Sequence, residues 1–227
     1  RTIFILELDA DVIDLVNFTF STGSEFRHET FEALAGGQPS FIGAGAQSFP
    51  GLQPNNAVKA SRYNVGVYMD ADWNVNKQFL VNMAARYERY SDFGSNFSWK
   101  ANARYTPNEQ FFIRGSVSTG FRAPSLHQIY LSTIQTIVST GTVSNQGTFN
   151  NLSPIINALE VPKLKEENSF NIGAGIGFTP SEKISITADY YRIVVDDRIV
   201  FTSSIASNDP NQLVGQILDT YNVTSIK

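Results

Sequence analysis

Residues 104–130 read RYTPNEQFFIRGSVSTGFRAPSLHQIY, and this stretch decides the fold class. It begins with a turn at 106–110, where Pro107 presets φ and Asn108 tolerates turn geometry. A strand follows in which apolar and polar positions alternate with a period of two. Its apolar positions are Phe111, Ile113, Gly115 and Val117. From Gly120 the chain opens into a polar segment that lacks apolar periodicity as far as residue 166.

The same alternation recurs along the chain. We expect strands at 18–28, 63–73, 79–88, 97–105, 170–178 and 184–191, and residues 2–9 are also β-prone. Short turns at 74–78, 106–110 and 179–183 alternate with longer polar connections at 29–61, 91–96, 120–166 and beyond 197. Short turns on one side and long loops on the other are typical of an up-and-down membrane barrel. No amphipathic helix is expected.

Composition excludes several function classes. The 227 residues contain no cysteine, which excludes disulfides, thiolate chemistry and sulfur-based zinc sites. The net charge is −4 and no basic run occurs, which disfavours nucleic-acid binding. The longest wholly apolar run is Ile3-Phe4-Ile5-Leu6, whereas a membrane helix needs about 20 residues. A membrane-spanning β-barrel remains possible, because its strands cross the membrane with alternating apolar and polar residues and need no long apolar run.

The polar faces decide between a barrel and a soluble β-sandwich. A sandwich would bury charges at a large desolvation cost. The charges concerned are Asp70, Asp72, Arg86, Glu88, Lys100, Arg104 and Arg114. Aromatic residues bracket the apolar faces, and eight to ten tilted residues span roughly 19–23 Å. We therefore predict an all-β fold, a transmembrane antiparallel up-and-down β-barrel. A secreted β-sandwich for adhesion or glycan binding is the alternative, and a passive porin is a third possibility.

Four motifs resemble those of TonB-dependent outer-membrane receptors. The first is the opening stretch, from RYTP through RGS to TGFRAPSL with QIY. The second is RYERYSDFG at 86–94 followed by Lys100, and the third is LKEENS at 164–169, with Glu166 where the family commonly has proline. The fourth is DYYR at 189–192 with DRI at 197–199. They occur in the family's order over roughly residues 60–200.

The resemblance implies a large barrel, usually of roughly 22 strands, plugged by an N-terminal domain. Such a receptor imports a scarce nutrient (siderophore, cobalamin, glycan or peptide) across the outer membrane of a Gram-negative bacterium, using energy delivered by TonB. It implies that residues 1–227 form about eight or nine strands of a longer protein. Plug, TonB box and terminal aromatic strand are expected outside this chain. The implied partners are outer-membrane lipid, the protein's own plug, the TonB complex, a small nutrient ligand and a surface lipoprotein.

Three groups of candidate site residues follow. The motif expected to face the plug and lumen comprises Arg104, Arg114, Gly120, Phe121, Arg122, Ala123, Pro124 and Ser125. The expected lumen charge network comprises Asp70, Asp72, Arg86, Glu88 and Lys100. The candidate ligand loop carries His127, Gln128 and Tyr130. Arg122 could anchor the plug or a loop, or contact an anionic ligand directly.

Neither a catalytic constellation nor a metal or cofactor site is predicted. His28 and His127 are far apart in sequence, and no nucleophile motif accompanies them. Some haem receptors of the family use a histidine after a similar motif, but the second haem motif is not visible, so a solvated loop histidine is the default.

The glycines at 173, 175 and 177 lie within a strand and precede no helix, which disfavours phosphate binding. We interpret them as a thin wall where the plug approaches. The amide-rich 120–166 segment is expected to capture a neutral or chelated ligand.

Overall fold

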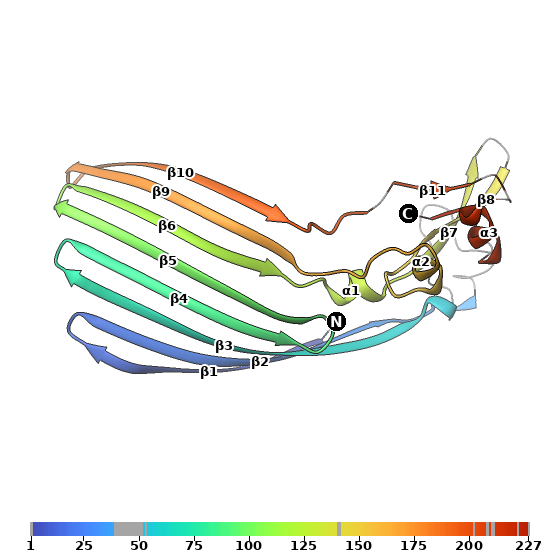
Figure 1. Ribbon diagram of the computed structural model, residues 1–227, viewed down its shortest axis with the longest axis horizontal. Coiled ribbons are helices and arrows are strands. Elements are labelled where there is room, and N and C mark those ends of the chain that lie inside the picture. Colours follow the sequence, from blue (N-terminus) through green and yellow to red (C-terminus); the bar gives the residue numbers. More distant parts are fainter. Residues whose placement is uncertain are drawn as a thin grey trace.

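The computed structural model of the chain describes residues 2–38, 52, 54–139, 142–201, 203–207, 209, 212–221 and 223–226. Eight strands form one antiparallel sheet in the order β1-β2-β3-β4-β5-β6-β9-β10 (Figure 1). Their bounds are β1 Thr2–Leu15, β2 Phe18–Ala33, β3 Val58–Asn76, β4 Phe79–Tyr90, β5 Gly94–Asn108, β6 Phe111–Arg122, β9 Glu167–Ser181 and β10 Ile184–Asp196. The predicted up-and-down sheet is confirmed. It remains open between β1 and β10, so these residues form a section of a barrel wall.

Two-residue turns join the strands at one end of the sheet (Figure 1). They lie at 16–17, 77–78, 109–110 and 182–183, and the first was not predicted. Local hydrogen bonding explains two of them, because asparagine side chains form turns with the backbone two residues on. Asn76 Oδ1 accepts from the amides of Gln78 and Phe79, at 2.8 and 2.9 Å. Asn108 Oδ1 accepts from the Gln110 amide at 3.0 Å.

The opposite end carries the longer connections, and we call it the loop end. The predicted loop at 29–61 is too long, since β2 continues to Ala33 and β3 begins at Val58. The prediction rested on the Gly, Pro, Gln and Asn content of the stretch, which does not mark the strand ends. Glu29 and Arg62, at these ends, are buried in the sheet and bonded to each other. The predicted connection at 91–96 likewise shortens to 91–93, because β5 starts at Gly94.

The two faces of the sheet follow the predicted alternation. On the apolar face, Val67, Met69, Met83, Ile113 and Ile172 are exposed, and Val81 is partly exposed. Cross-strand pairs keep this parity, as Val67 lies opposite Tyr87 and Ile113 opposite both Tyr105 and Ile176. A soluble sandwich would bury such a face, so that alternative is wrong. The apolar face is the one expected to meet lipid.

The glycines of β9 lie on the polar face, and neighbouring side chains cover them. A Cβ on Gly177 would collide with the Phe112 ring, and one on Gly175 with the Asp189 carboxylate. A Cβ on Gly173 would come within 2.8 Å of Ser116 Oγ. These glycines therefore make room for side chains of β6 and β10 lying across the strand. This replaces the interpretation of a wall left thin for a plug.

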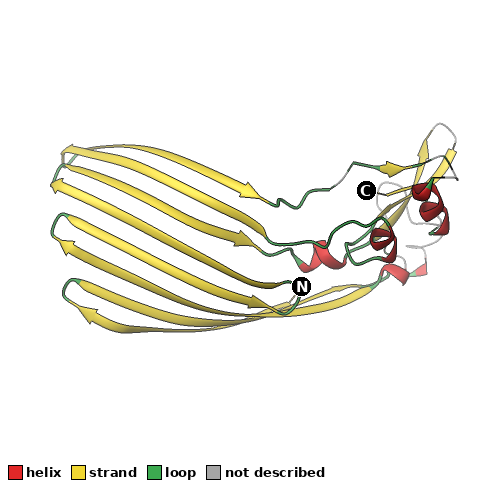
Figure 2. Ribbon diagram, in the orientation of Figure 1, coloured by secondary structure: helices red, strands yellow, loops and turns green. Residues whose placement is uncertain are grey.

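A small lobe lies at the loop end (Figure 2). It contains β7 Thr133–Ser139, β8 Thr142–Thr148, α2 Pro154–Ala158, β11 Ile205–Ala206, α3 Leu213–Thr220 and β12 Ser225–Ile226. Two further short helices lie outside it, the 3-10 helix η2 Pro54–Asn56 and α1 Leu126–Tyr130. The expectation of no helix and no regular structure in these segments was wrong. None of the helices within the described ranges is long and apolar enough to cross a membrane.

The lobe joins two connections that are distant in sequence. Its sheet has the order β11-β12-β8-β7, and β12 pairs in parallel with β8. Its core contains Ile155, Leu218, Val223 and Ile226, each at most 3% exposed. Ile155 comes from the connection after β6, and Leu218, Val223 and Ile226 come from the segment after β10, so the core contains residues of both. The connection after β6 and the segment after β10 thus fold as one unit.

Candidate functional site on the lumen face

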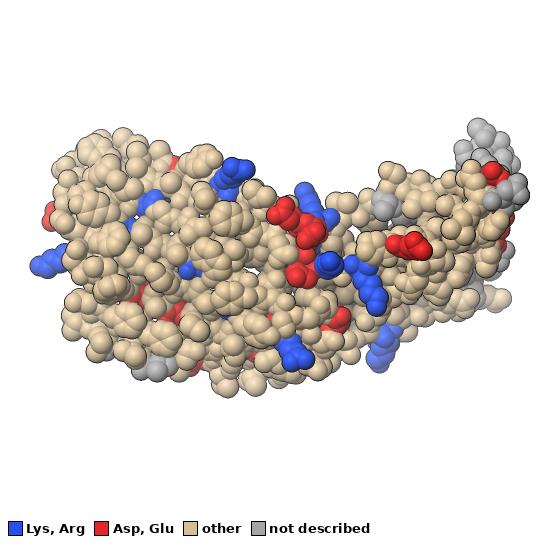
Figure 3. All heavy atoms as spheres, viewed as in Figure 1, with Lys and Arg blue, Asp and Glu red and all other residues tan. Residues whose placement is uncertain are grey.

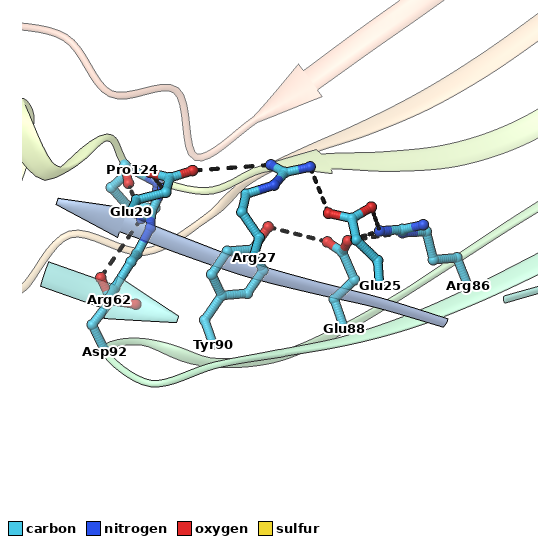
Figure 4. A network of polar contacts seen from close by, with 9 residues as sticks. All are labelled: Glu25, Arg27, Glu29, Arg62, Arg86, Glu88, Tyr90, Asp92 and Pro124. Carbon is cyan, nitrogen blue, oxygen red and sulfur yellow. Dashed lines mark hydrogen bonds and ion pairs between the residues drawn. The ribbon is translucent and has the colours of Figure 1, made fainter. Parts of the chain in front are cut away.

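The polar face bears a charged cluster near the loop end, here called the upper cluster (Figure 4). It comprises Glu25, Arg27, Glu29, Arg62, Arg86, Glu88, Tyr90 and Asp92. Arg86 Nη2 lies 2.9 Å from Glu25 Oε2, and Arg86 Nε donates to Glu88 Oε1 at 2.8 Å. Arg27 Nη2 lies 2.7 Å from Glu25 Oε1. The cluster thereby ties β2 to β4 across the lumen face of β3.

Arg62 connects the upper cluster to the chain beyond β6. Its side chain is 6% exposed, and Nη2 lies 3.1 Å from Glu29 Oε2. Nη1 lies 3.6 Å from Asp92 Oδ2 and donates to the Pro124 carbonyl oxygen at 2.5 Å. A planar guanidinium suits this role, because its donors point in several fixed directions. The result is a direct link between β3 and the segment leading into α1.

Aromatic rings pack around the buried Tyr90. Its hydroxyl donates to Glu88 Oε2 at 3.1 Å, and the Arg62 guanidinium lies 5.3 Å from its ring centroid. Phe93 stacks on Tyr90 at 4.5 Å and Phe121 meets it edge-on at 6.0 Å. The predicted motif residue Phe121 thus packs against the cluster. Such desolvation strengthens the ionic contacts beside the ring.

The remaining motif residues mainly shape the end of the wall. Arg122 forms a bidentate pair with Glu167, with Nε to Oε2 at 2.8 Å and Nη2 to Oε1 at 2.7 Å. Glu167 Oε1 also accepts from the Ile199 amide at 2.8 Å. This clamp joins β6, β9 and the segment after β10. Ala123 is partly buried and Pro124 fully buried, while Gly120 lies against Ser169 Oγ.

The candidate ligand-loop residues lie on α1. Gln128 is used in a capping box, since the Ser125 amide donates to Gln128 Oε1 at 2.9 Å and Ser125 Oγ accepts from the Gln128 amide. The exposed His127 ring meets Phe31 edge-on at 5.7 Å. Tyr130 accepts a hydrogen bond from Asn150 through its carbonyl oxygen, at 2.9 Å. Of the three side chains, Gln128 has the clearest structural role.

The predicted lumen network is divided in the structure. Arg86 and Glu88 belong to the upper cluster. Asp70 and Asp72 lie nearer the turns, where both accept from Asn82 Nδ2 at 3.0 Å. Lys100 of β5 lies in the cross-strand row of Asp70, with Ala84 of β4 between them. Sequence reasoning missed the other members of the upper cluster, which are Glu25, Arg27, Glu29, Arg62, Tyr90 and Asp92. No group of residues in the described ranges has the composition and geometry of a metal site.

A second group, the lower cluster, lies nearer the turns and contains Arg104, Arg114, Phe112 and Asp189. Arg114 forms a bidentate pair with Asp189, with Nη2 at 2.7 Å from both carboxylate oxygens. Arg104 stacks on Phe112, with its guanidinium carbon 4.5 Å from the ring centroid. The predicted motif residues Arg104 and Arg114 are thus brought together, while Arg122 lies at the opposite end of β6.

These observations define a class of protein. Figure 3 shows that, on the face in view, charged side chains gather mainly between the strand wall and the lobe. An outward apolar face, a charged inner face, turns at one end and a folded lobe at the other make this chain a section of a large outer-membrane β-barrel. A family model described as "TonB dependent receptor-like, beta-barrel" matches residues 4–226. The chain belongs to this family, which confirms the resemblance and places it in the outer membrane of a Gram-negative bacterium.

Curated relatives match part of the chain. The ferric enterobactin receptor PirA of Pseudomonas aeruginosa is 25% identical over 124 residues, covering 54% of this chain and 16% of the relative. An iron-regulated outer membrane virulence protein of Vibrio cholerae is 24% identical over 148 residues, covering 64% of this chain and 20% of the relative. The aligned part is therefore at most a fifth of these relatives' length.

Solved structures share the fold. The siderophore receptor PirA from Acinetobacter baumannii has a TM-score of 0.62 and 20% identity, with 92% of this chain and 30% of that chain covered. A variant of the ferric enterobactin receptor PfeA from Pseudomonas aeruginosa has a TM-score of 0.62 and 16% identity, with 85% and 26% covered. At this identity the similarity concerns the fold alone.

Proposed function

We propose that residues 1–227 form the partial barrel of a receptor that imports a scarce nutrient with energy delivered through TonB, and that the nutrient is an iron chelate of the siderophore class. The observation that carries the proposal is the folded lobe above a charged lumen wall, within a family of TonB-dependent receptors. A rigid wall that positions adaptable polar loops is suited to ligand capture.

Support for iron comes from the relatives. Two curated proteins similar to this chain are named as a ferric enterobactin receptor and an iron-regulated outer membrane protein. The structures of similar fold include siderophore receptors and an iron transporter from Neisseria meningitidis. In this reading the iron is cargo, held by its chelator, and this chain needs no resident metal.

The residues take the following roles under this proposal. The apolar face meets lipid, while the upper and lower clusters face the plug. The lobe and α1 contribute to capture of the chelate, with His127 and Tyr130 as candidate contacts. Arg62 and the Arg122–Glu167 clamp hold these elements on the wall. TonB acts through the plug, and a surface lipoprotein is a further candidate partner. The activity is transport, and no residue is assigned a catalytic role.

Uptake of radioactive iron by whole cells tests the proposal. A strain lacking the receptor gene, but carrying the full-length receptor on a plasmid, should accumulate iron from a ferric siderophore only when TonB is present. Receptor-dependent uptake that persists without TonB would favour a passive porin, and liposome swelling by the purified receptor would establish it. Absence of receptor-dependent uptake across a panel of ferric siderophores would refute the siderophore class.

The lobe is tested by deleting residues 133–155. This removes β7, β8 and the core residue Ile155. The barrel should insert normally and ligand binding at the cell surface should be lost. The control is Lys77→Gln, in the β3–β4 turn at the opposite end of the sheet, which should bind normally. Unchanged uptake after the deletion would exclude the lobe as the capture element.

A further inference from the structure

Two arginines lie directly opposite each other on the lumen face of the wall. Arg104 of β5 pairs with Arg114 of β6 in the antiparallel ladder, so their side chains share one face. Like charges directly opposite each other destabilise a sheet. The pair therefore requires compensation by anions close at hand.

Arg114 has its anion within this chain. Its guanidinium reaches over Gly175 of β9 to the Asp189 carboxylate of β10, with contacts of 2.7–3.0 Å. Any side chain at position 175 would obstruct this bridge, because a Cβ there would lie 2.9 Å from Arg114 Nε and still closer to Asp189. The glycine and the ion pair are thus two parts of one arrangement that satisfies Arg114.

Arg104 lacks an equivalent anion. None of the carboxylates in the described part of the chain forms an ion pair with it, and its guanidinium instead stacks on the Phe112 ring. The Arg114 guanidinium approaches the same ring at 5.8 Å. A stacked guanidinium keeps its in-plane N–H donors available for a carboxylate. Two arginines and one aspartate leave the lower cluster with one uncompensated positive charge.

A hollow adjoins this charge. It has a volume of about 310 Å³, and its lining includes Arg104, Arg114, Ser116, Gly173, Gly175 and Asp189. A side chain entering from the lumen would therefore meet Arg104 on one side and the Arg114–Asp189 pair on the other.

We propose that Arg104 binds a carboxylate side chain from a part of the receptor outside residues 1–227 that occupies the lumen. Compensation from the protein itself fits best, because the Arg104–Arg114 repulsion is present in every state of the wall, with or without cargo. The site also lies near the turns, remote from the lobe. The aligned region is only 16–20% of the length of the curated relatives, which leaves ample chain to supply the carboxylate. This inference rests on the proposed function, in which the lower cluster faces the plug, and is independent of the nutrient's identity.

The test uses the full-length receptor carrying Arg104→Lys, which keeps the positive charge and supplies an amine. Carbodiimide joins an amine to a carboxylate in contact, and mass spectrometry of the digest identifies the joined peptides. We expect a cross-link from position 104 to an aspartate or glutamate outside residues 1–227. The control is Arg89→Lys on β4, which is exposed on the lipid-side parity and should give no such cross-link.

Because lysine is shorter than arginine, a second variant is measured whose effect does not depend on the reach of the side chain. Arg104→Gln should increase the rate at which a protease degrades the lumen-filling part by about tenfold, the loss expected for one charged hydrogen bond. Arg89→Gln should leave that rate unchanged. A cross-link confined to Asp189 or another residue of 1–227 would overturn the proposal. So would an absent cross-link together with an unchanged protease rate in Arg104→Gln.

Discussion

The Arg62→Gln substitution should release the segment that follows β6 from the wall. Arg62 is 6% exposed and contacts Glu29, Asp92 and the Pro124 carbonyl. Glutamine is too short to reach all three and carries no charge. Glu29, with its side chain 5% exposed, would then be a buried anion with weaker compensation.

The magnitude follows from burial. Removing one partner of a buried ion pair costs about 3–5 kcal/mol, because the other charge stays desolvated. Each 1.4 kcal/mol is a factor of ten in an equilibrium constant, so local opening should become about 150–4,000 times more frequent. The loss should be concentrated where Arg62 acts, in α1 and the adjoining ends of β2 and β3.

Hydrogen exchange on the full-length receptor measures this opening. The amides of Ile129 and Leu131, which donate to Ser125 and His127, report on α1. Their protection should fall by about 150–4,000-fold in Arg62→Gln. In Arg89→Gln, an exposed control on β4, it should stay within about 0.5 kcal/mol of the parent. Equal protection in the two variants would refute the view that Arg62 holds α1 on the wall.

Three further predictions concern other parts of the chain. Gly175→Val should lower stability by about 1–3 kcal/mol in urea titrations through overpacking, whereas Gly115→Ala, whose Cβ would meet nothing nearer than 3.9 Å, should have little effect. Met83→Arg on the lipid face should cost about 2–4 kcal/mol of folding free energy into bilayers, and Asn82→Arg on the lumen face much less; equal costs would contradict the face assignment. Leu218→Asp should unfold the lobe and abolish ligand binding at the cell surface, while the heat-modifiable gel mobility of the barrel persists. Normal binding in this variant would show that ligand capture does not depend on the lobe core.

The wall could be predicted because its signal is local. Alternation of apolar and polar residues depends only on neighbours in sequence, and the pairing of Val67 with Tyr87 and of Ile113 with Ile176 preserved every predicted face. Strand ends were less predictable. Glu29 and Arg62 are charged and look like loop residues until each is placed beside the other, 33 positions away.

The lobe and the clusters could not be predicted because their contacts join residues that are distant in sequence. Ile155 and Leu218 form one core although they belong to different connections, so neither sequence segment shows by itself what it packs against. Arg122 was expected to anchor the plug or a loop, or to contact an anionic ligand. In the wall it pairs with Glu167 of the next strand, which also accepts from the Ile199 amide. Sequence parity placed such residues on a face but could not choose their partners.

The most direct test of the account is solvent accessibility along β3 in the full-length receptor reconstituted into bilayers. Residues 1–227 contain no cysteine, so single cysteines carrying spin labels can be introduced at successive positions from Asn64 to Asp70, omitting Gly66. A barrel wall predicts oxygen access, the signature of lipid, at 65, 67 and 69, and low oxygen access at 64, 68 and 70. Accessibility without this period of two, or water-soluble relaxation agents reaching both faces equally, would contradict a barrel wall.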